Sequence, residues 1–157
     1  MSVRMTTRGD APALATAEYE ALLSTLRDLP GSAWAAPTDC EGWTVWHIVA
    51  HVVGAAEEAA RPLVLVRHAI GALGRHRTGV LVDALNAQQI ADRRGRTPRD
   101  LVDELARLAP AAVRGRNRLP AAVRRLHLPA AAGCQPGDTL GYLYDVIYTR
   151  DIWLHRV

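Results

Sequence analysis

The sequence predicts an all-α fold, and three observations support this prediction. Apolar residues recur close to the helical repeat, residues typical of helix starts and stops flank these stretches, and no segment alternates apolar and polar residues in a sustained way. The chain has 157 residues, of which 49% are hydrophobic, which is enough for one continuous core. We therefore expect a single domain over residues 1–157, built as a helical bundle.

The first helix is expected between Ala11 and Leu29. Its leucines recur at helix-like spacing, and Pro30 followed by Gly31 is a strong stop signal. Residues 34–42 are rich in turn-forming residues, so this stretch is expected to connect two helices.

The second helix is expected to begin after Thr44, whose hydroxyl suits the N-cap position. Branched apolar residues form one stripe along it: Val45, Ile48, Val49, Val52 and Val53. The helix should end near Arg61, where Pro62 permits a kink or a restart before a further helical stretch to Leu73.

The middle of the chain is expected to contain a loop or a hinge at Gly74–Gly79, followed by a helix over residues 81–93. Another helix should start at Thr97, because Thr97 can cap it and Pro98 suits its first position. This helix can pass Pro110 only with a bend.

The last third of the chain should open with an irregular crossover over residues 118–136, which hold three prolines. A final helix is then expected to start at Asp138 or Thr139 and to run to the end of the sequence.

Basic residues are unevenly distributed, and all 19 of them are arginines. The net charge is −3 over residues 1–92 and +6 over residues 93–157, and ten arginines fall between Arg93 and Arg125. A phosphate-binding surface is one interpretation of this charge, but the stretch has no aromatic residue for base stacking and no helix-turn-helix, and acidic residues interrupt it. We predict a solvated arginine-rich face and no nucleic-acid partner.

No apolar run is long enough to span a membrane, and the N-terminus lacks the apolar stretch of a secretory signal. The sequence therefore predicts a soluble, cytoplasmic protein with no membrane partner. Its two cysteines, Cys40 and Cys134, form no C-x-x-C pair, and we interpret both as reduced thiols.

Two stretches each place potential metal ligands four residues apart, His47 with His51 and Asp151 with His155. Residues at this spacing lie one turn apart on the same face of a helix. A lone histidine on an apolar helix is more often a hydrogen-bonded core residue, but two such stretches together favour a metal site. Imidazoles with a carboxylate suit zinc, nickel or iron better than calcium or magnesium.

The same two segments resemble a known family. Residues 37–51 (PTDCEGWTVWHIVAH) and residues 148–155 (YTRDIWLH) are similar to the DinB-type metal-binding bundles, specifically their mycothiol-dependent maleylpyruvate isomerase branch. The resemblance covers essentially the whole chain, although its specific motifs lie in these two segments. It implies a DinB-like four-helix bundle with long crossover connections.

Carried over position by position, the resemblance implies that His51, Asp151 and His155 bind one divalent metal, most suitably zinc. Three protein ligands leave one coordination position open, which is typical of catalytic sites. The resemblance implies that this position accepts the sulfur of mycothiol or a similar low-molecular-weight thiol as co-substrate. Asp151 stands where the family has a glutamate, so the site must close slightly or lose affinity.

Three assignments are open for His47: an additional ligand, a group that supports a ligand or lines the pocket, and a surface residue. The residue lies one turn before His51 and can approach the metal face of the helix. Because the resemblance calls for His51 alone on this helix, we favour the supporting or pocket role.

Ordinary structural roles are predicted for the other aromatic and imidazole side chains. Three tryptophans are expected mainly in the core: Trp43, Trp46 and Trp153. Three histidines have no ligand spacing and are expected to be exposed: His68, His76 and His127.

The predicted function is a metal-dependent and thiol-dependent transfer or isomerisation of a small electrophilic substrate, as in a mycothiol-dependent S-transferase or a maleylpyruvate-isomerase-like enzyme. Arg150 and Arg156 are candidates for anchoring an anionic substrate or the thiol. The alternative is a non-catalytic metal-binding module that acts through a partner. A homodimer is usual for such bundles.

Overall fold

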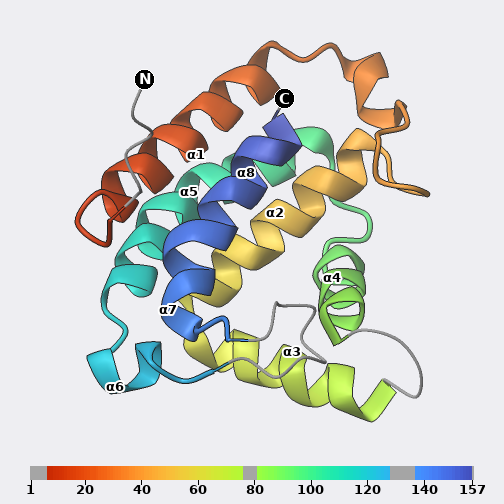
Figure 1. Cartoon of the computed structure of the whole chain (residues 1–157). Helices are drawn as coiled ribbons and strands as arrows, with labels where there is room; N and C mark the ends of the chain where they lie inside the picture. The colour runs from red at the N-terminus through yellow and green to blue at the C-terminus, as the bar shows by residue number, and fades with distance from the viewer. Residues whose placement is uncertain (1–6, 76–80, 128–136, 157) are drawn as a thin grey trace.

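The computed structural model describes residues 7–75, 81–127 and 137–156 of the chain (Figure 1). Helices make up most of this part of the chain, and its β-structure is limited to two isolated bridges. The predicted all-α fold is therefore confirmed.

Helices from the two ends and the middle of the chain pack side by side around the core (Figure 1) and form four rods. They are α1 (Ala11–Asp28), α2 (Val45–Ala60), α5 (Pro98–Asn117) and a C-terminal rod made of α7 (Leu140–Tyr142), η3 (Leu143–Ile147) and α8 (Tyr148–Arg156). Helices α3 (Pro62–Arg75) and α4 (Leu81–Ala91) flank α2, and the short segments η1 (Gly31–Ala35) and α6 (Ala121–Arg124) lie in connections. The arrangement is that of a DinB-like bundle.

The core depends on a close approach between α2 and α5. Valines of α2, including Val49 and Val53, are almost fully buried in the same cluster as Leu105 of α5. Near the end of α5, a Cβ built on Gly115 would lie 2.0 Å from the carbonyl oxygen of Ala59. A residue with any side chain would therefore hold the two helices apart at this point.

The predicted helix start at Thr97 is present, and side chains cap it. The Thr97 hydroxyl accepts a hydrogen bond from the Asp100 backbone N–H at 3.2 Å, and the Asp100 carboxylate accepts one from the Thr97 N–H at 2.9 Å. This reciprocal capping box fixes the start of α5. The helix continues past Pro110 to Asn117, and this proline lies inside it.

The C-terminal rod begins at Leu140, directly after Thr139, which is one of the two predicted starts. Thr139 is the N-cap residue, and its hydroxyl accepts a hydrogen bond from the Tyr142 N–H at 3.2 Å. The rod is not a uniform α-helix, because η3 forms a turn of π-helix directly before α8. Such turns accommodate an extra residue and often occur next to functional sites. Here the turn lies immediately before the segment that carries Asp151 and His155.

The prediction of a solvated arginine-rich face is wrong for three of its residues, which are buried: Arg93, Arg116 and Arg124. Arg93 shows the reason, because its Nη2 lies 3.0 Å from Glu57 and 2.9 Å from Glu104. These acidic side chains balance the charge of Arg93 inside the protein. They are not neighbours of Arg93 in the sequence, so the local sequence alone suggested a solvated arginine.

Two predictions about burial are also wrong. Trp153 is 44% exposed, because it lies on the outer side of α8, whose neighbouring Ile152 faces the core. His68 is only 2% exposed, because its Nδ1 lies 2.7 Å from a carboxylate oxygen of Glu58 on α2. His127 is exposed as predicted.

Several predictions fall wholly or partly outside the described residues. They concern most of the Gly74–Gly79 loop, residues 128–136 of the crossover, His76 and Cys134. In the described part of the chain, Cys40 is a free thiol. No helix found there combines the length and the apolar character needed to cross a lipid bilayer.

Candidate metal centre

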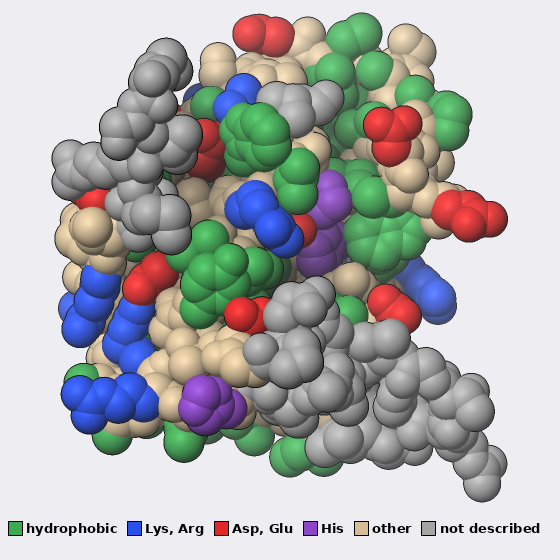
Figure 2. All heavy atoms as spheres, in the orientation of Figure 1, with side chains coloured by type: hydrophobic (Ala, Val, Ile, Leu, Met, Phe, Trp, Pro, Cys, Tyr) green, Lys and Arg blue, Asp and Glu red, His purple; other side chains and the backbone are tan. Residues whose placement is uncertain are grey.

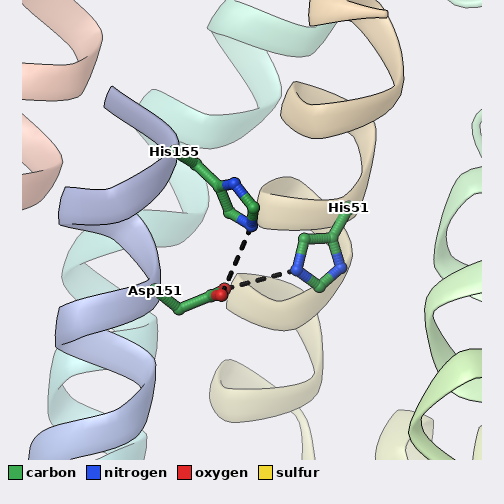
Figure 3. Close-up of side chains that lie close together, drawn as sticks. All are labelled: His51, Asp151 and His155. Atoms are coloured by element: carbon green, nitrogen blue, oxygen red, sulfur yellow. Dashed lines mark hydrogen bonds and ion pairs between the residues drawn. The ribbon is translucent and has the colours of Figure 1, made fainter. Parts of the chain in front are cut away.

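The candidate ligands converge from two rods that are distant in the sequence (Figure 3). His51 lies on α2 and is 7% exposed. Asp151 and His155 lie one turn apart on α8, and both are half-buried. Figure 2 shows histidine side chains reaching the surface where α2 and α8 run side by side, among hydrophobic and charged groups.

The three side chains form a compact cluster around the carboxylate of Asp151. Its Oδ2 lies 3.3 Å from His51 Nε2, and its Oδ1 lies 3.3 Å from His155 Nε2. The two imidazole rings are perpendicular, with centroids 5.4 Å apart. One potential ligand atom from each residue lies within 4.8 Å of the others.

The electrostatics of the cluster keep Asp151 ionised. Burial alone raises the pKa of this carboxyl, but hydrogen bonds with His155 and His51 outweigh burial and hold the pKa well below its usual range. An ionised carboxylate between two imidazole nitrogens is the donor set expected of a site for a transition metal.

The spacing of these donor atoms fits a tetrahedral ion. Metal–nitrogen and metal–oxygen distances of about 2.1 Å place neighbouring tetrahedral ligand atoms roughly 3.4 Å apart. The two contacts with Asp151 are each 3.3 Å, although they involve different oxygens of its carboxylate. One ligand atom from each residue lies within 4.8 Å of the others, so the residues fit one zinc-sized ion once the three side chains draw closer together.

The side chain of His47 interacts with the start of its own helix. Its Nδ1 accepts a hydrogen bond from the Thr44 backbone N–H at 3.2 Å and lies 2.8 Å from the Thr44 hydroxyl. Its ring also contacts Trp46 edge to face. Among the described residues, His47 is not part of the group that could share an ion.

Two residues that were not predicted as site residues interact with His51, one directly and one through the other. Gln89 of α4 places its Oε1 2.7 Å from His51 Nδ1, and it also contacts Glu58 of α2. Glu58 could have been noticed, because it is an acid two turns after His51 on the same side of an apolar helix. Nothing in the local sequence marks Gln89. Trp43, expected in the core, is half-buried with its ring 5.4 Å from that of His51.

A cavity of about 360 Å³ adjoins His155. Apolar side chains such as Leu22 and Ile48 form much of its wall, and Cys40 and Arg156 also line it. The cavity is large enough for part of a small organic molecule and lies directly beside a candidate ligand.

The two candidate anchoring arginines differ in their surroundings. Arg156 lines the cavity, but its Nη2 lies 3.1 Å from a carboxylate oxygen of Glu18 on α1. Arg150 is exposed and is not among the residues that line this cavity. A charged ligand in the cavity would therefore meet Arg156 first.

Comparison with known proteins adds evidence that is independent of this geometry. The model of the mycothiol maleylpyruvate isomerase N-terminal domain family matches residues 15–157 of the chain. No curated protein and no solved structure matches the chain. The matched range includes both segments that carry the candidate ligands.

Proposed function

This chain belongs to the mycothiol maleylpyruvate isomerase N-terminal domain family, and we propose that it is a metal-dependent enzyme that uses a low-molecular-weight thiol. The metal would be a single divalent ion, most suitably zinc, held by His51, Asp151 and His155. The thiol would be mycothiol or a similar molecule, and the reaction would transfer it to a small electrophile or isomerise that electrophile.

One observation carries this proposal. Two nitrogen atoms converge from α2 and α8 on the carboxylate of Asp151, each at 3.3 Å from one of its oxygens, and the cluster is partly open to solvent. Only three protein side chains form this cluster in the described part of the chain. A site with three protein ligands keeps one position for an exogenous group, which distinguishes catalytic from structural zinc.

The metal would supply one chemical effect, which is to lower the pKa of a thiol bound at the open position so that the reactive thiolate prevails near neutral pH. The protein side chains would orient the reactants. The apolar cavity beside His155 would exclude water from the thiol or the electrophile, and Arg156 would attract a negatively charged group on either of them.

Titration of the cobalt-substituted protein with a thiol tests this proposal. We expect an intense thiolate-to-cobalt absorption band that saturates at one thiol per cobalt, because the sulfur enters the open position. The S-methylated form of the same thiol is the control and should give no such band, because it cannot form a thiolate. A cobalt-loaded protein that gives no band with the free thiol would contradict the proposal and favour a non-catalytic metal-binding module.

A further inference from the structure

A continuous line of buried hydrogen bonds runs away from the metal face of His51. His51 Nδ1 lies 2.7 Å from Gln89 Oε1, and Gln89 Nε2 donates to Glu58 Oε2 at 2.9 Å. The other oxygen of Glu58 lies 2.7 Å from His68 Nδ1. Helices α2, α4 and α3 each contribute to this line, which is distinct from the three candidate ligands.

The chemistry of these groups fixes the direction of every hydrogen bond in the line. An ionised carboxylate only accepts, so Glu58 receives hydrogen bonds from both His68 Nδ1 and Gln89 Nε2. A side-chain amide has one donor end and one acceptor end. Gln89 must therefore turn its oxygen toward His51.

The oxygen of Gln89 can only accept, so the ring of His51 must donate to it from Nδ1. Nε2 also faces an acceptor, the carboxylate of Asp151, but at 3.3 Å against 2.7 Å for the contact between Nδ1 and Gln89, and Asp151 has a second partner in His155. When the ring of His51 carries a single proton, that proton therefore belongs on Nδ1, and Nε2 keeps the lone pair. The hydrogen-bonded line thus selects the tautomer of His51 in which the nitrogen on the metal side is free to bind an ion.

We propose that Glu58, which does not touch the metal cluster, imposes the metal-binding tautomer of His51, and that Gln89 is the positioning residue that transmits this preference. The link to metal affinity rests on the proposed function, whereas the tautomer itself is a property of the metal-free protein.

Burial makes this control effective. His68, Glu58 and Gln89 are all buried, so water does not compete for their hydrogen bonds. His68 supplies the partner that a buried carboxylate requires, since an unpaired charge in the interior is very costly. Its other ring nitrogen, Nε2, lies 2.9 Å from Asp92 at the protein surface.

The packing of α4 against α2 also favours this arrangement. A Cβ built on Gly54, one turn after His51, would lie 2.4 Å from Cβ and 2.6 Å from Cγ of Gln89. The glycine therefore provides the space in which the side chain of Gln89 enters between Glu58 and His51.

The substitution Glu58→Gln tests the proposal. The new side chain has nearly the same size, but its amide group can donate as well as accept a hydrogen bond, so it no longer fixes the orientation of the Gln89 amide. While His68 donates to the new side-chain oxygen, the new amide group donates to Gln89. Gln89 must then rotate and offer its own N–H to His51, which reverses the tautomer. We expect the affinity for Co²⁺ to fall by about 10- to 100-fold, the effect typical of groups that orient a metal-binding histidine.

The decisive readout is the tautomer of His51 in the metal-free protein, measured by ¹⁵N–¹H correlation spectra of histidine-labelled samples at a pH where His51 is neutral. The wild type should carry the proton on Nδ1, and Glu58→Gln should shift it to Nε2. The matched control is Glu57→Gln, since Glu57 is the neighbouring acid and pairs instead with Arg61 and Arg93. It should change neither the tautomer nor the affinity.

If Glu58→Gln does not fold, Gln89→Met replaces it, because this variant removes the acceptor and should leave His51 as a mixture of tautomers. An Nδ1-protonated His51 that persists in the folded variant would overturn the proposal, as would an Nε2-protonated His51 in the wild type. A wild type with the expected tautomer that binds no metal would contradict the proposed function and leave the control of the tautomer standing.

Discussion

Replacing any one of His51, Asp151 and His155 by alanine is expected to lower the affinity for Zn²⁺ or Co²⁺ by more than about 100-fold. A binding free energy of about 10–16 kcal/mol, divided among a few ligands, assigns at least about 3 kcal/mol to each of them. Competition with a chromophoric chelator measures the affinity, and metal analysis of the purified proteins measures occupancy.

The matched control for this experiment is His47→Ala, which removes a histidine one turn before His51 on the same helix. Its imidazole caps α2 through Thr44 and does not join the cluster. We expect unchanged metal affinity with a loss of stability of about 1 kcal/mol, as for other helix caps. Equal metal content in all three ligand variants and the wild type would contradict the ligand assignment.

The substitution Gly115→Ala is expected to destabilise the fold by at least about 2 kcal/mol. The new methyl group would lie 2.0 Å from the carbonyl oxygen of Ala59 and 3.0 Å from its carbonyl carbon. Both are backbone atoms of α2, so they cannot rotate away as a side chain could. Urea unfolding followed by circular dichroism measures the effect, which should lower the midpoint without a change of slope.

The control for this variant is Gly31→Ala, because a Cβ at Gly31 would meet no heavy atom within 4 Å. Its stability should stay within about 0.5 kcal/mol of the wild type. A Gly115→Ala protein as stable as this control would show that α2 and α5 do not approach as closely as the structure indicates.

The helix boundaries were predictable because local interactions determine them. Thr97 and Asp100 cap each other within one turn, and Thr44 and Thr139 occupy the other predicted start positions. The predicted end of the first helix at Leu29 differs by one residue from the observed end at Asp28. The π-helical turn η3 carries no comparable local signal and was not predicted.

The grouping of the candidate ligands was also accessible from the sequence. The spacing of Asp151 and His155 determines that they share one face of a helix, and the family resemblance selected His51 as the third residue. The structure brings these three side chains together. Their role as metal ligands remains a prediction until a bound ion is measured.

The prediction that His68 is exposed was wrong because its partners lie on other parts of the chain. Spacing along one helix describes only partners on that helix, whereas His68 on α3 is held by Glu58 on α2 and by Asp92, which directly follows α4. Such a network depends on how three helices pack. For the same reason, the sequence did not reveal Gln89, whose position depends on the close approach of α4 at Gly54.

X-ray absorption at the zinc edge is the most direct measurement of the proposed metal site, in which three protein ligands and a thiol share one ion. The spectra are recorded on the zinc-loaded protein with and without a bound thiol. Without thiol, we expect a first shell of nitrogen and oxygen atoms only, with the scattering pattern of two imidazoles from His51 and His155. With thiol, one sulfur should appear at about 2.3 Å. A sulfur-free shell in the presence of saturating thiol, or a shell with no imidazole scattering, would contradict a three-ligand site that keeps one position for sulfur.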